Sequence, residues 1–248
     1  MPIFNGRGLS SKYWAEEDRE RFVFEHKKSL ILNLIYDWSR RYQSLLEIGC
    51  GTGEFLEVFW ETGFDVTGID PSPTNICGAR SRLGSKSDFY IGQVDYLAFE
   101  DNQFDYVAMI NILDLRTRPE TVIHEAYRIA RKGFIIGFLN RFFWYSFMGE
   151  MSKKWTRSLH SNDQIKAESW FGVKRILRRD IPGSVRFTAG SVLPWPQWSW
   201  IYYCWFQRMN KKFYSPYWGM FSAARVDLGE ERPLTPLMAW NTEPKAIG

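Results

Sequence analysis

Hydrophobic and polar residues follow two different periods along the first 140 residues. From Asp18 to Arg41, apolar side chains recur at steps of three and four between charged ones, which predicts an amphipathic helix. Short apolar runs bounded by Gly, Pro or Asp predict strands at residues 44–48, 65–69, 89–91, 104–110 and 134–138. Helical spacing predicts helices between them at residues 54–61, 72–82 and 119–131. This alternation predicts an α/β fold with a parallel sheet covered by helices on both faces.

Beyond residue 140 the alternation weakens. A helix is predicted at about residues 163–179, with strands near 185–188 and 220–226. The uncharged stretch from Phe187 to Gln207 has the length of a membrane span. It contains two prolines, and its bulk is Trp and Tyr, which favour membrane interfaces over the bilayer centre, so we expect no transmembrane helix there. No Gly/Ser-rich linker divides the chain, and one domain is expected.

The composition is close to a globular average, with 45% apolar and 24% charged residues, which argues against a disordered, collagen-like or disulfide-scaffold chain. Aromatic residues are enriched at 17%, including twelve Trp. The net charge of +4 is uneven, because residues 1–140 carry 16 basic and 20 acidic groups whereas residues 141–248 carry 16 and 8. The positive second half indicates an anionic substrate, a lipid surface or a nucleic acid, or else a solvated basic face.

Three cysteines, Cys50, Cys77 and Cys204, lie far apart and form no CxxC or Cys/His pattern, so no metal site is expected. This usage favours a reducing cytosol. The first residues lack the apolar core of a signal peptide, which also favours a cytoplasmic protein.

The most informative stretch runs from Leu45 to Phe55 and reads Leu-Leu-Glu-Ile-Gly-Cys-Gly-Thr-Gly-Glu-Phe. Its glycines let the backbone turn sharply and approach a ligand, while the following helix start offers unpaired N–H groups. A dinucleotide-binding loop needs G-x-G-x-x-G, but here Glu54 holds the place of the last glycine. Glu47 would also repel a pyrophosphate, whereas it suits a ligand that carries an amino group and a positive centre.

Two further acids follow predicted strands. Asp70 ends the second strand, where a carboxylate can accept hydrogen bonds from both hydroxyls of a ribose, and Asp95 follows the third. Each acid also has a plainer interpretation: Glu47 as a surface carboxylate, Asp70 as a helix N-cap and Asp95 as a loop acid. The position of Glu47 at the end of an apolar strand favours binding, and capping by Asp70 would not prevent it from holding a ribose.

With these residues the chain resembles class I S-adenosylmethionine-dependent methyltransferases of the small-molecule type, often grouped with the ubiquinone and menaquinone methyltransferases. The resemblance covers about residues 30–140 and includes Glu125-Ala126-Tyr127-Arg128 before the fifth strand. It implies S-adenosylmethionine as cofactor, S-adenosylhomocysteine as product and no metal. It also implies a Rossmann-like sheet of seven mostly parallel strands, with an N-terminal helical cap at 1–43, a cofactor-binding core at 44–140 and a substrate-side region with a divergent aromatic cap at 141–248.

The resemblance further implies roles in the glycine loop. Glu47 would contact the methionine amino group of the cofactor, and Gly49, Cys50 and Gly51 would line its methionine and ribose, in a loop completed by Gly53. Beyond this place in the lining we assign Cys50 no chemical role, because such a cysteine is more often a small packing residue.

Other implied contacts lie at the ends of the next strands. Asp70 would hold the ribose hydroxyls, with Pro71 packing near the adenine. Asp95 would accept a hydrogen bond from the adenine amino group, and Tyr96 would supply a backbone N–H. Asn111, just past the fourth strand, would lie against the cofactor near the transferred methyl group.

A general base is needed only if the methyl acceptor arrives protonated, as a phenol or alcohol would. The histidine that many relatives carry after the fourth strand is missing at residues 112–115. His26 and His124 fall in predicted helices, where we expect structural roles. His160 lies in the segment that walls the substrate pocket in relatives, so it is either the base or a surface residue. The candidate substrate-side residues, which packing would explain equally well, are Tyr13, Arg141, Trp144 and Tyr145.

The segment Trp195–Phe206 contains seven aromatic residues in twelve and is followed by basic residues at 208, 211 and 212. Three interpretations stay open. The segment is a lid for a flat, apolar substrate, an interfacial patch against an anionic membrane, or core filling and a dimer contact.

The resemblance and the composition together predict a cytoplasmic enzyme, a monomer or homodimer, that methylates a small aromatic or anionic molecule. Peripheral contact with an anionic membrane stays open as one interpretation of the aromatic segment. The basic second half keeps a nucleic-acid methyltransferase open. Against it, the residues after the fourth strand contain neither the Asn/Asp-Pro-Pro-aromatic nor the Pro-Cys motif of such enzymes. A second alternative is a regulatory protein that binds the cofactor without catalysis.

Overall fold

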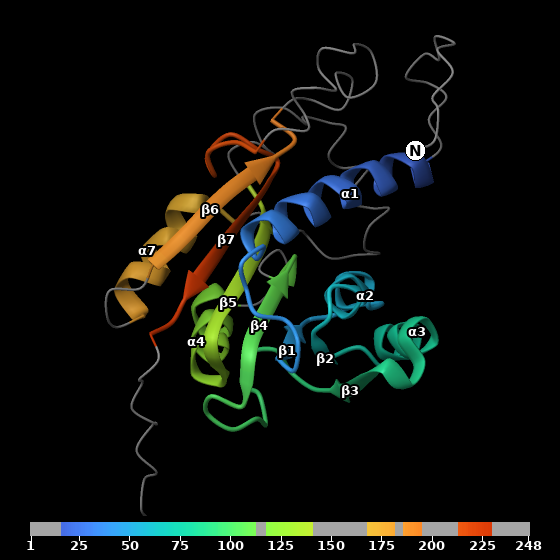
Figure 1. Ribbon diagram of the computed structural model, residues 1–248. Coiled ribbons are helices and arrows are strands. Elements are labelled where there is room, and N and C mark those ends of the chain that lie inside the picture. The colour runs from blue at the N-terminus through green and yellow to red at the C-terminus, as the bar shows by residue number, and fades with distance from the viewer. Residues whose placement is uncertain (1–15, 113–117, 141–167, 182–185, 195–212, 230–248) are drawn as a thin grey trace, which may run out of the picture.

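The structure is a computed structural model that describes residues 16–112, 118–140, 168–181, 186–194 and 213–229. Figure 1 shows a twisted sheet with helices on both of its faces. In chain order the elements are α1 (Glu16–Leu34), β1 (Ser44–Ile48), α2 (Glu54–Glu61), β2 (Asp65–Asp70), α3 (Pro73–Leu83), η2 (Gly84–Lys86), β3 (Ser87–Ile91), β4 (Phe104–Ile110), α4 (Pro119–Ile129), β5 (Ala130–Leu139), α7 (Trp170–Asp180), β6 (Arg186–Val192) and β7 (Phe221–Asp227).

Seven strands form one sheet in the order β3-β2-β1-β4-β5-β7-β6. All neighbouring pairs from β3 to β5 are parallel, and β7 runs antiparallel to both β5 and β6. One apolar cluster joins α1 and α2 to one face of the sheet, and a second cluster joins α4 and α7 to the other face. The predicted Rossmann-like, mostly parallel seven-stranded fold with an N-terminal helix is therefore confirmed.

Most predicted elements occur at their expected places, but the first helix is shorter than predicted. It ends at Leu34 rather than Arg41, and the chain then turns. Ile35 and Trp38 are nevertheless buried, and the indole of Trp38 stacks on Tyr106 of β4 with ring centroids 4.2 Å apart. The apolar spacing of these two residues reflects a turn that is buried against the sheet, so the prediction that the helix continues to Arg41 is wrong.

A second correction concerns the boundary between α4 and β5. The helix ends at Ile129, not at Arg131, and the strand begins four residues before the predicted Phe134. The start of this strand was predicted too late, because Arg131 and Lys132 place two charged residues in it. Both form ion pairs with Asp105 of the neighbouring β4, which explains why charged residues are accommodated there.

The C-terminal elements also differ in extent from the prediction. Helix α7 begins at Trp170, and the predicted start at residue 163 lies outside the described residues. Strand β6 extends to Val192, which places the first part of the suspected membrane-length stretch in the sheet. Among the described residues, no helix is long and apolar enough to cross a bilayer.

Candidate functional site

The glycine loop connects the carboxyl end of β1 to the start of α2. Gly49, Gly51 and Gly53 have positive φ angles of 70°, 53° and 80°, which side chains rarely adopt. The backbone N–H groups of Gly49 and Cys50 both donate to the carbonyl of Ile69 in β2, at 2.8 and 3.1 Å. The loop is thereby fixed against the neighbouring strand, as a ligand-approaching turn requires.

Close packing adds to this requirement at two of the glycines. A Cβ atom at Gly49 would overlap with Cδ1 of Ile112, and one at Gly53 would lie 3.1 Å from the Cβ of Ala79 in α3. At Gly51, by contrast, nothing lies within 4 Å of the position a Cβ would take. This open side marks where a ligand can approach the loop backbone.

Glu47 lies in β1 just before this loop and is only 2% exposed, so its interpretation as a surface carboxylate is wrong. Burial, followed by the nearby charges of Asp70 and Glu54, raises the pKa of Glu47 well above its usual value, although a hydrogen bond with the backbone of Leu56 opposes the shift. The Oε2 atom is buried and has no hydrogen-bond partner in the structure. A carboxyl group in this state is suited to a positively charged donor.

Asp70 ends β2 and is 5% exposed. Its Oδ2 accepts from the N–H of Gly51 at 3.0 Å, and its Oδ1 accepts from the N–H of Ser72 at 2.8 Å and from Nδ2 of Asn75 at 3.0 Å. The N-cap of α3 is Ser72, so the alternative of Asp70 as that helix cap is wrong. Asp70 instead ties the glycine loop to the start of α3, and Pro71 beside it is exposed.

Asp95 and Tyr96, which the family resemblance predicts to contact the adenine, lie after β3. Both side chains are exposed, Tyr96 by 82%, while Val94 and Leu97 on either side are buried. Their roles in binding stay predictions.

Asn111 follows β4 and has a positive φ of 62°. Its backbone N–H donates to the carbonyl of Gly137, and its side-chain Oδ1 accepts from Nζ of Lys27 in α1 at 3.2 Å. Nζ of Lys27 also lies 4.9 Å from the ring centroid of Phe221. Lys27 could not be predicted from the sequence, because only the packing of α1 across the sheet brings it to Asn111, which is 84 positions away.

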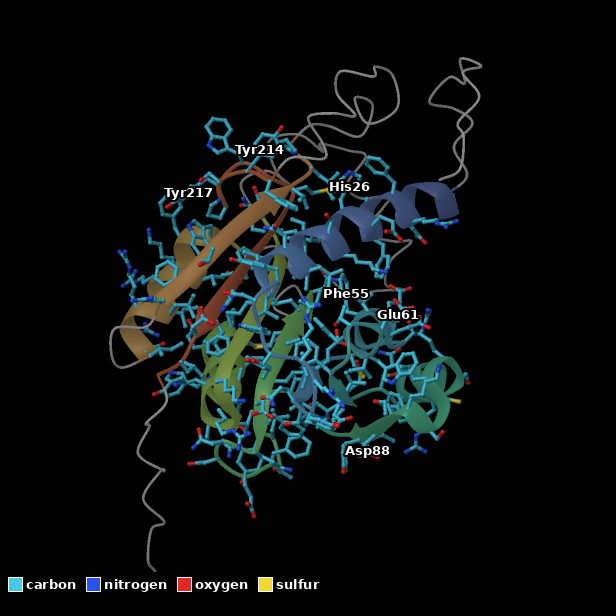
Figure 2. All side chains as sticks on the ribbon, in the orientation of Figure 1. His26, Phe55, Glu61, Asp88, Tyr214 and Tyr217 are labelled. Carbon is cyan, nitrogen blue, oxygen red and sulfur yellow. The ribbon has the colours of Figure 1, made fainter. Side chains whose placement is uncertain are left out.

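A cleft of about 560 Å³ extends between α1 and α2, with Lys27 and Asn111 among its lining residues. Figure 2 shows Phe55 and Glu61 of α2 below α1 on this side of the molecule. The rings of Phe24 and Phe55 meet in its wall with centroids 5.1 Å apart. Its volume falls in the range of small-molecule sites.

Cys50 is buried, and burial followed by the charges of Glu47 and Asp70 strongly raises the pKa of its thiol. A thiol in this state is a poor nucleophile, in keeping with a packing role. Nδ1 of His26 donates to the carbonyl of Phe22 at 2.7 Å, and Nε2 of His124 lies 3.5 Å from Oδ2 of Asp180. In the part of the chain that the structure describes, no three His, Cys, Asp or Glu side chains gather as a metal site.

Several predicted residues fall outside the described part of the chain. They are the candidate base His160, the substrate-side residues Tyr13, Arg141, Trp144 and Tyr145, and the aromatic segment 195–206.

Comparison with known proteins agrees with this geometry. Residues 46–137 match the family described as "Methyltransferase domain". The chain is similar to a ubiquinone biosynthesis O-methyltransferase from Azoarcus sp. (strain BH72), with 31% identity over 107 residues, which are 41% of this chain and 46% of the relative. The chain therefore spans about half the length of this relative.

Two solved structures share the fold over most of the chain. One is a SAM-dependent methyltransferase from Thermotoga maritima, a possible histamine N-methyltransferase, with a TM-score of 0.59, 20% identity and coverage of 85% of this chain and 95% of that one. The other is the magnesium protoporphyrin IX methyltransferase from Synechocystis PCC 6803 with bound SAH, with a TM-score of 0.56, 14% identity and 90% coverage of each chain.

Proposed function

Because the chain contains a class I S-adenosylmethionine-dependent methyltransferase domain, we propose that the protein transfers a methyl group from S-adenosylmethionine to a small molecule. The observation that carries this proposal is the buried carboxyl of Glu47, whose Oε2 has no partner. S-adenosylmethionine brings an ammonium group and a positively charged sulfur, both of which suit the acids at this edge of the sheet. The cofactor supplies a methyl group on a good leaving group, which a nucleophile of the acceptor displaces.

The protein's contribution is to hold and align the two reactants. Glu47 accepts the ammonium group, the open side of Gly51 admits the methionine and ribose, and Asp70 accepts from the ribose hydroxyls. Asp70 already accepts three hydrogen bonds. A carboxylate has about four lone-pair sites, and each oxygen can share a site between donors, so Asp70 can also accept from the ribose. Such positioning contributes several kcal/mol to lowering the barrier.

Lys27 completes the charge pattern around the amino-acid end of the cofactor. An ammonium group at Glu47 has a carboxylate attached one carbon away, and that group needs a cation. Lys27 supplies this cation, because it lies close to the glycine loop. Its Nζ contacts Asn111, and the next residue, Ile112, packs against Gly49. The position of α1 over the glycine loop thus becomes part of cofactor binding.

We propose a small aromatic acceptor at the open end of this site. The phenylalanine-lined wall of the cleft supports an aromatic ring. Its charged lining, with five acidic and four basic side chains, favours neither sign of charge on the acceptor. The relative that acts in ubiquinone biosynthesis is consistent with such an acceptor.

Isothermal titration calorimetry with S-adenosylhomocysteine tests the cofactor proposal, with NAD as the comparison ligand. We expect one site for S-adenosylhomocysteine and none for NAD, whose pyrophosphate meets Glu47. Asp65→Asn, an exposed carboxylate at the start of β2 and outside the cleft, is the matched charge control and should bind like the wild type. Binding of NAD alone would replace the methyltransferase proposal with a dinucleotide-binding function.

A specific surface also favours contact with an anionic membrane. Phe171 at the start of α7 is 59% exposed and packs against Tyr217 with ring centroids 4.9 Å apart, and the neighbouring Trp218 is 69% exposed. Figure 2 shows Tyr217 at the end of the sheet where α7 begins. Arg175 and Arg178 extend this surface along α7. Exposed aromatic rings beside cations are typical of membrane-interface binding.

Sedimentation with vesicles tests this second proposal. We expect binding to vesicles that contain phosphatidylglycerol but not to neutral ones, and loss of binding in Trp218→Ser. Tyr42→Ser, which removes an equally exposed aromatic side chain before β1, should retain binding. Binding of RNA rather than vesicles by the same surface would favour the nucleic-acid alternative.

A further inference from the structure

The segment after β3, which carries Asp95, is joined to α4 by one carboxylate and one guanidinium group. The N–H of Leu97 donates to Oε2 of Glu125 at 2.9 Å, and the carbonyl of Leu97 accepts from Nη2 of Arg128 at 3.0 Å. Nη1 of Arg128 donates to the carbonyl of Phe99 at 2.7 Å and to Oδ1 of Asp101 at 3.0 Å. Two side chains of α4 therefore fix the backbone of this segment at three points.

Glu125 and Arg128 also hold each other in place. The guanidinium donates to both carboxylate oxygens, through Nε at 2.9 Å and through Nη2 at 2.8 Å. This two-point contact fixes the plane of the guanidinium, so its remaining donors point at the carbonyls with little freedom. Lysine has no equivalent geometry, since its ammonium is a single flexible point of charge.

The opposite end of the segment is fixed at the sheet. The N–H of Gly92 donates to the carbonyl of Asp70 at 3.3 Å. Between these two anchors, Val94 and Leu97 are buried while Asp95 projects into solvent. The direction in which the Asp95 carboxylate points is thus set by backbone contacts at Gly92 and Leu97 and not by packing of its own side chain.

We propose that Arg128, held by Glu125, is a positioning residue for adenine recognition, because it fixes the backbone that aims Asp95 at the amino group of the adenine. The proposal rests on the proposed function and on the predicted role of Asp95. It assigns a role in cofactor selectivity to an ion pair that touches neither cofactor nor acceptor.

Paired titrations with S-adenosylhomocysteine and S-inosylhomocysteine test this role. The inosine compound replaces the amino group with an oxygen, which cannot donate to Asp95. A hydrogen bond to a carboxylate corresponds to a preference of about tenfold for the adenine compound in the wild type. We expect this ratio to fall to about one in Arg128→Met and to recover partly in Arg128→Lys.

Arg225→Met is the matched control. Arg225 is likewise an ion-paired arginine that contacts Asp37, Asp227 and the carbonyl of Leu34, but it lies in β7 and joins this strand to the end of α1. The control should lower thermal stability and keep the preference for adenine. A merely structural role of Arg128 would give the same result as the control, and that outcome would overturn the proposal.

A milder variant keeps the test decisive if Arg128→Met fails to fold. Glu125→Gln retains an acceptor for Leu97 while it removes the ion pair, and we expect it to reduce the ratio by several fold. An unchanged ratio in that variant rejects the positioning role. Equal affinity of the wild type for both ligands would show that Asp95 does not recognise the adenine amino group, and it would reject the positioning role as well. Failure to bind either ligand would reject the proposed function itself.

Discussion

Replacement of Glu47 by glutamine separates cofactor binding from fold stability. The substitution keeps the size of the side chain and an oxygen that accepts from the backbone of Leu56, but it removes the buried charge. In the wild type, Oε2 has no partner and faces the repulsion of Asp70 and Glu54. We therefore expect Glu47→Gln to bind the cofactor more weakly without a loss of stability in the free protein.

The magnitude follows from the single missing hydrogen bond. A hydrogen bond to a charged group contributes about 1.5–3 kcal/mol, which corresponds to a loss of about 10- to 150-fold in affinity. An unsatisfied buried polar atom costs about 1–3 kcal/mol in the free protein, and the buried amide of glutamine introduces a cost of this kind. The substitution also removes the unfavourable buried charge, and this gain in stability offsets that cost. The free energy of unfolding at pH 8 should then equal or exceed that of the wild type.

The raised pKa of Glu47 gives the substitution a pH signature. A carboxyl whose pKa is raised on folding stabilises the protein fully below its usual pKa of 4.5, and this contribution is lost as the pH rises through the higher folded value. Binding of an ammonium group favours the carboxylate, so the protein releases a proton on binding within that window. Glu47→Gln should abolish both effects.

Calorimetry in buffers of different ionisation enthalpy measures the released proton, and urea unfolding from pH 5 to pH 9 measures the stability difference. Asp65→Asn controls for the change in net charge, because Asp65 is exposed at the start of β2, at the opposite end of that strand from Asp70. Unchanged affinity for S-adenosylhomocysteine in Glu47→Gln would refute the assignment of the ammonium group to this carboxyl. A clear loss of stability would refute the account of its buried charge.

Three further outcomes test other parts of the site. Gly49→Ala combines a positive φ with overlap on Ile112 and should destabilise the protein by about 2 kcal/mol or more in thermal unfolding. Gly51→Ala also has a positive φ but open space around it, and it should destabilise the protein by about 1 kcal/mol. Lys27→Met should weaken S-adenosylhomocysteine about tenfold and leave the melting temperature nearly unchanged; unchanged affinity would remove it from the cofactor site. Burial raises the pKa of Asp105, but hydrogen bonds from Arg131, Ser44 and Lys132 outweigh it and lower the pKa overall. Asp105→Asn should therefore be destabilised at pH 7 by about 1–3 kcal/mol. Urea titrations should show this difference disappearing as the pH falls from 3.8 through the lower pKa of the folded protein.

Sequence patterns predicted the elements around the site better than those that cover it. The bounds of β1, α2 and β4 agree with the prediction, because each is a short apolar or amphipathic run ended by Gly, Asp or Asn. The end of α1 was missed because Trp38 remains buried beyond the helix, where its indole N–H donates to Asp227, 189 residues further along the chain. Such burial depends on contacts that no local period contains.

The same distinction applies to the site residues. Glu47 was predictable because it lies near the end of an apolar strand just before a glycine loop, and Asp70 because it ends the next apolar strand. Both arrangements are local in the sequence. Lys27 is one of many charged residues on a predicted helix, and nothing in its neighbours along the chain distinguishes it. Its contact with Asn111 exists only because α1 packs across the sheet, so the proposed cation of the site follows from tertiary structure alone.

Asp70 links these two levels, because it has one role in the fold and another in the proposed chemistry. Its carboxylate already orients the N–H of Gly51 and the start of α3 before any ligand arrives. The loop therefore need not reorganise when the cofactor binds, which lowers the entropic cost of binding. We therefore expect replacement of Asp70 to lower the affinity for the cofactor in two ways, by removing the proposed ribose contact and by loosening the loop. Replacement of Glu47 removes only a contact. A larger affinity loss in Asp70→Ala than in Glu47→Gln, together with a lower melting temperature, is the result that follows from this difference.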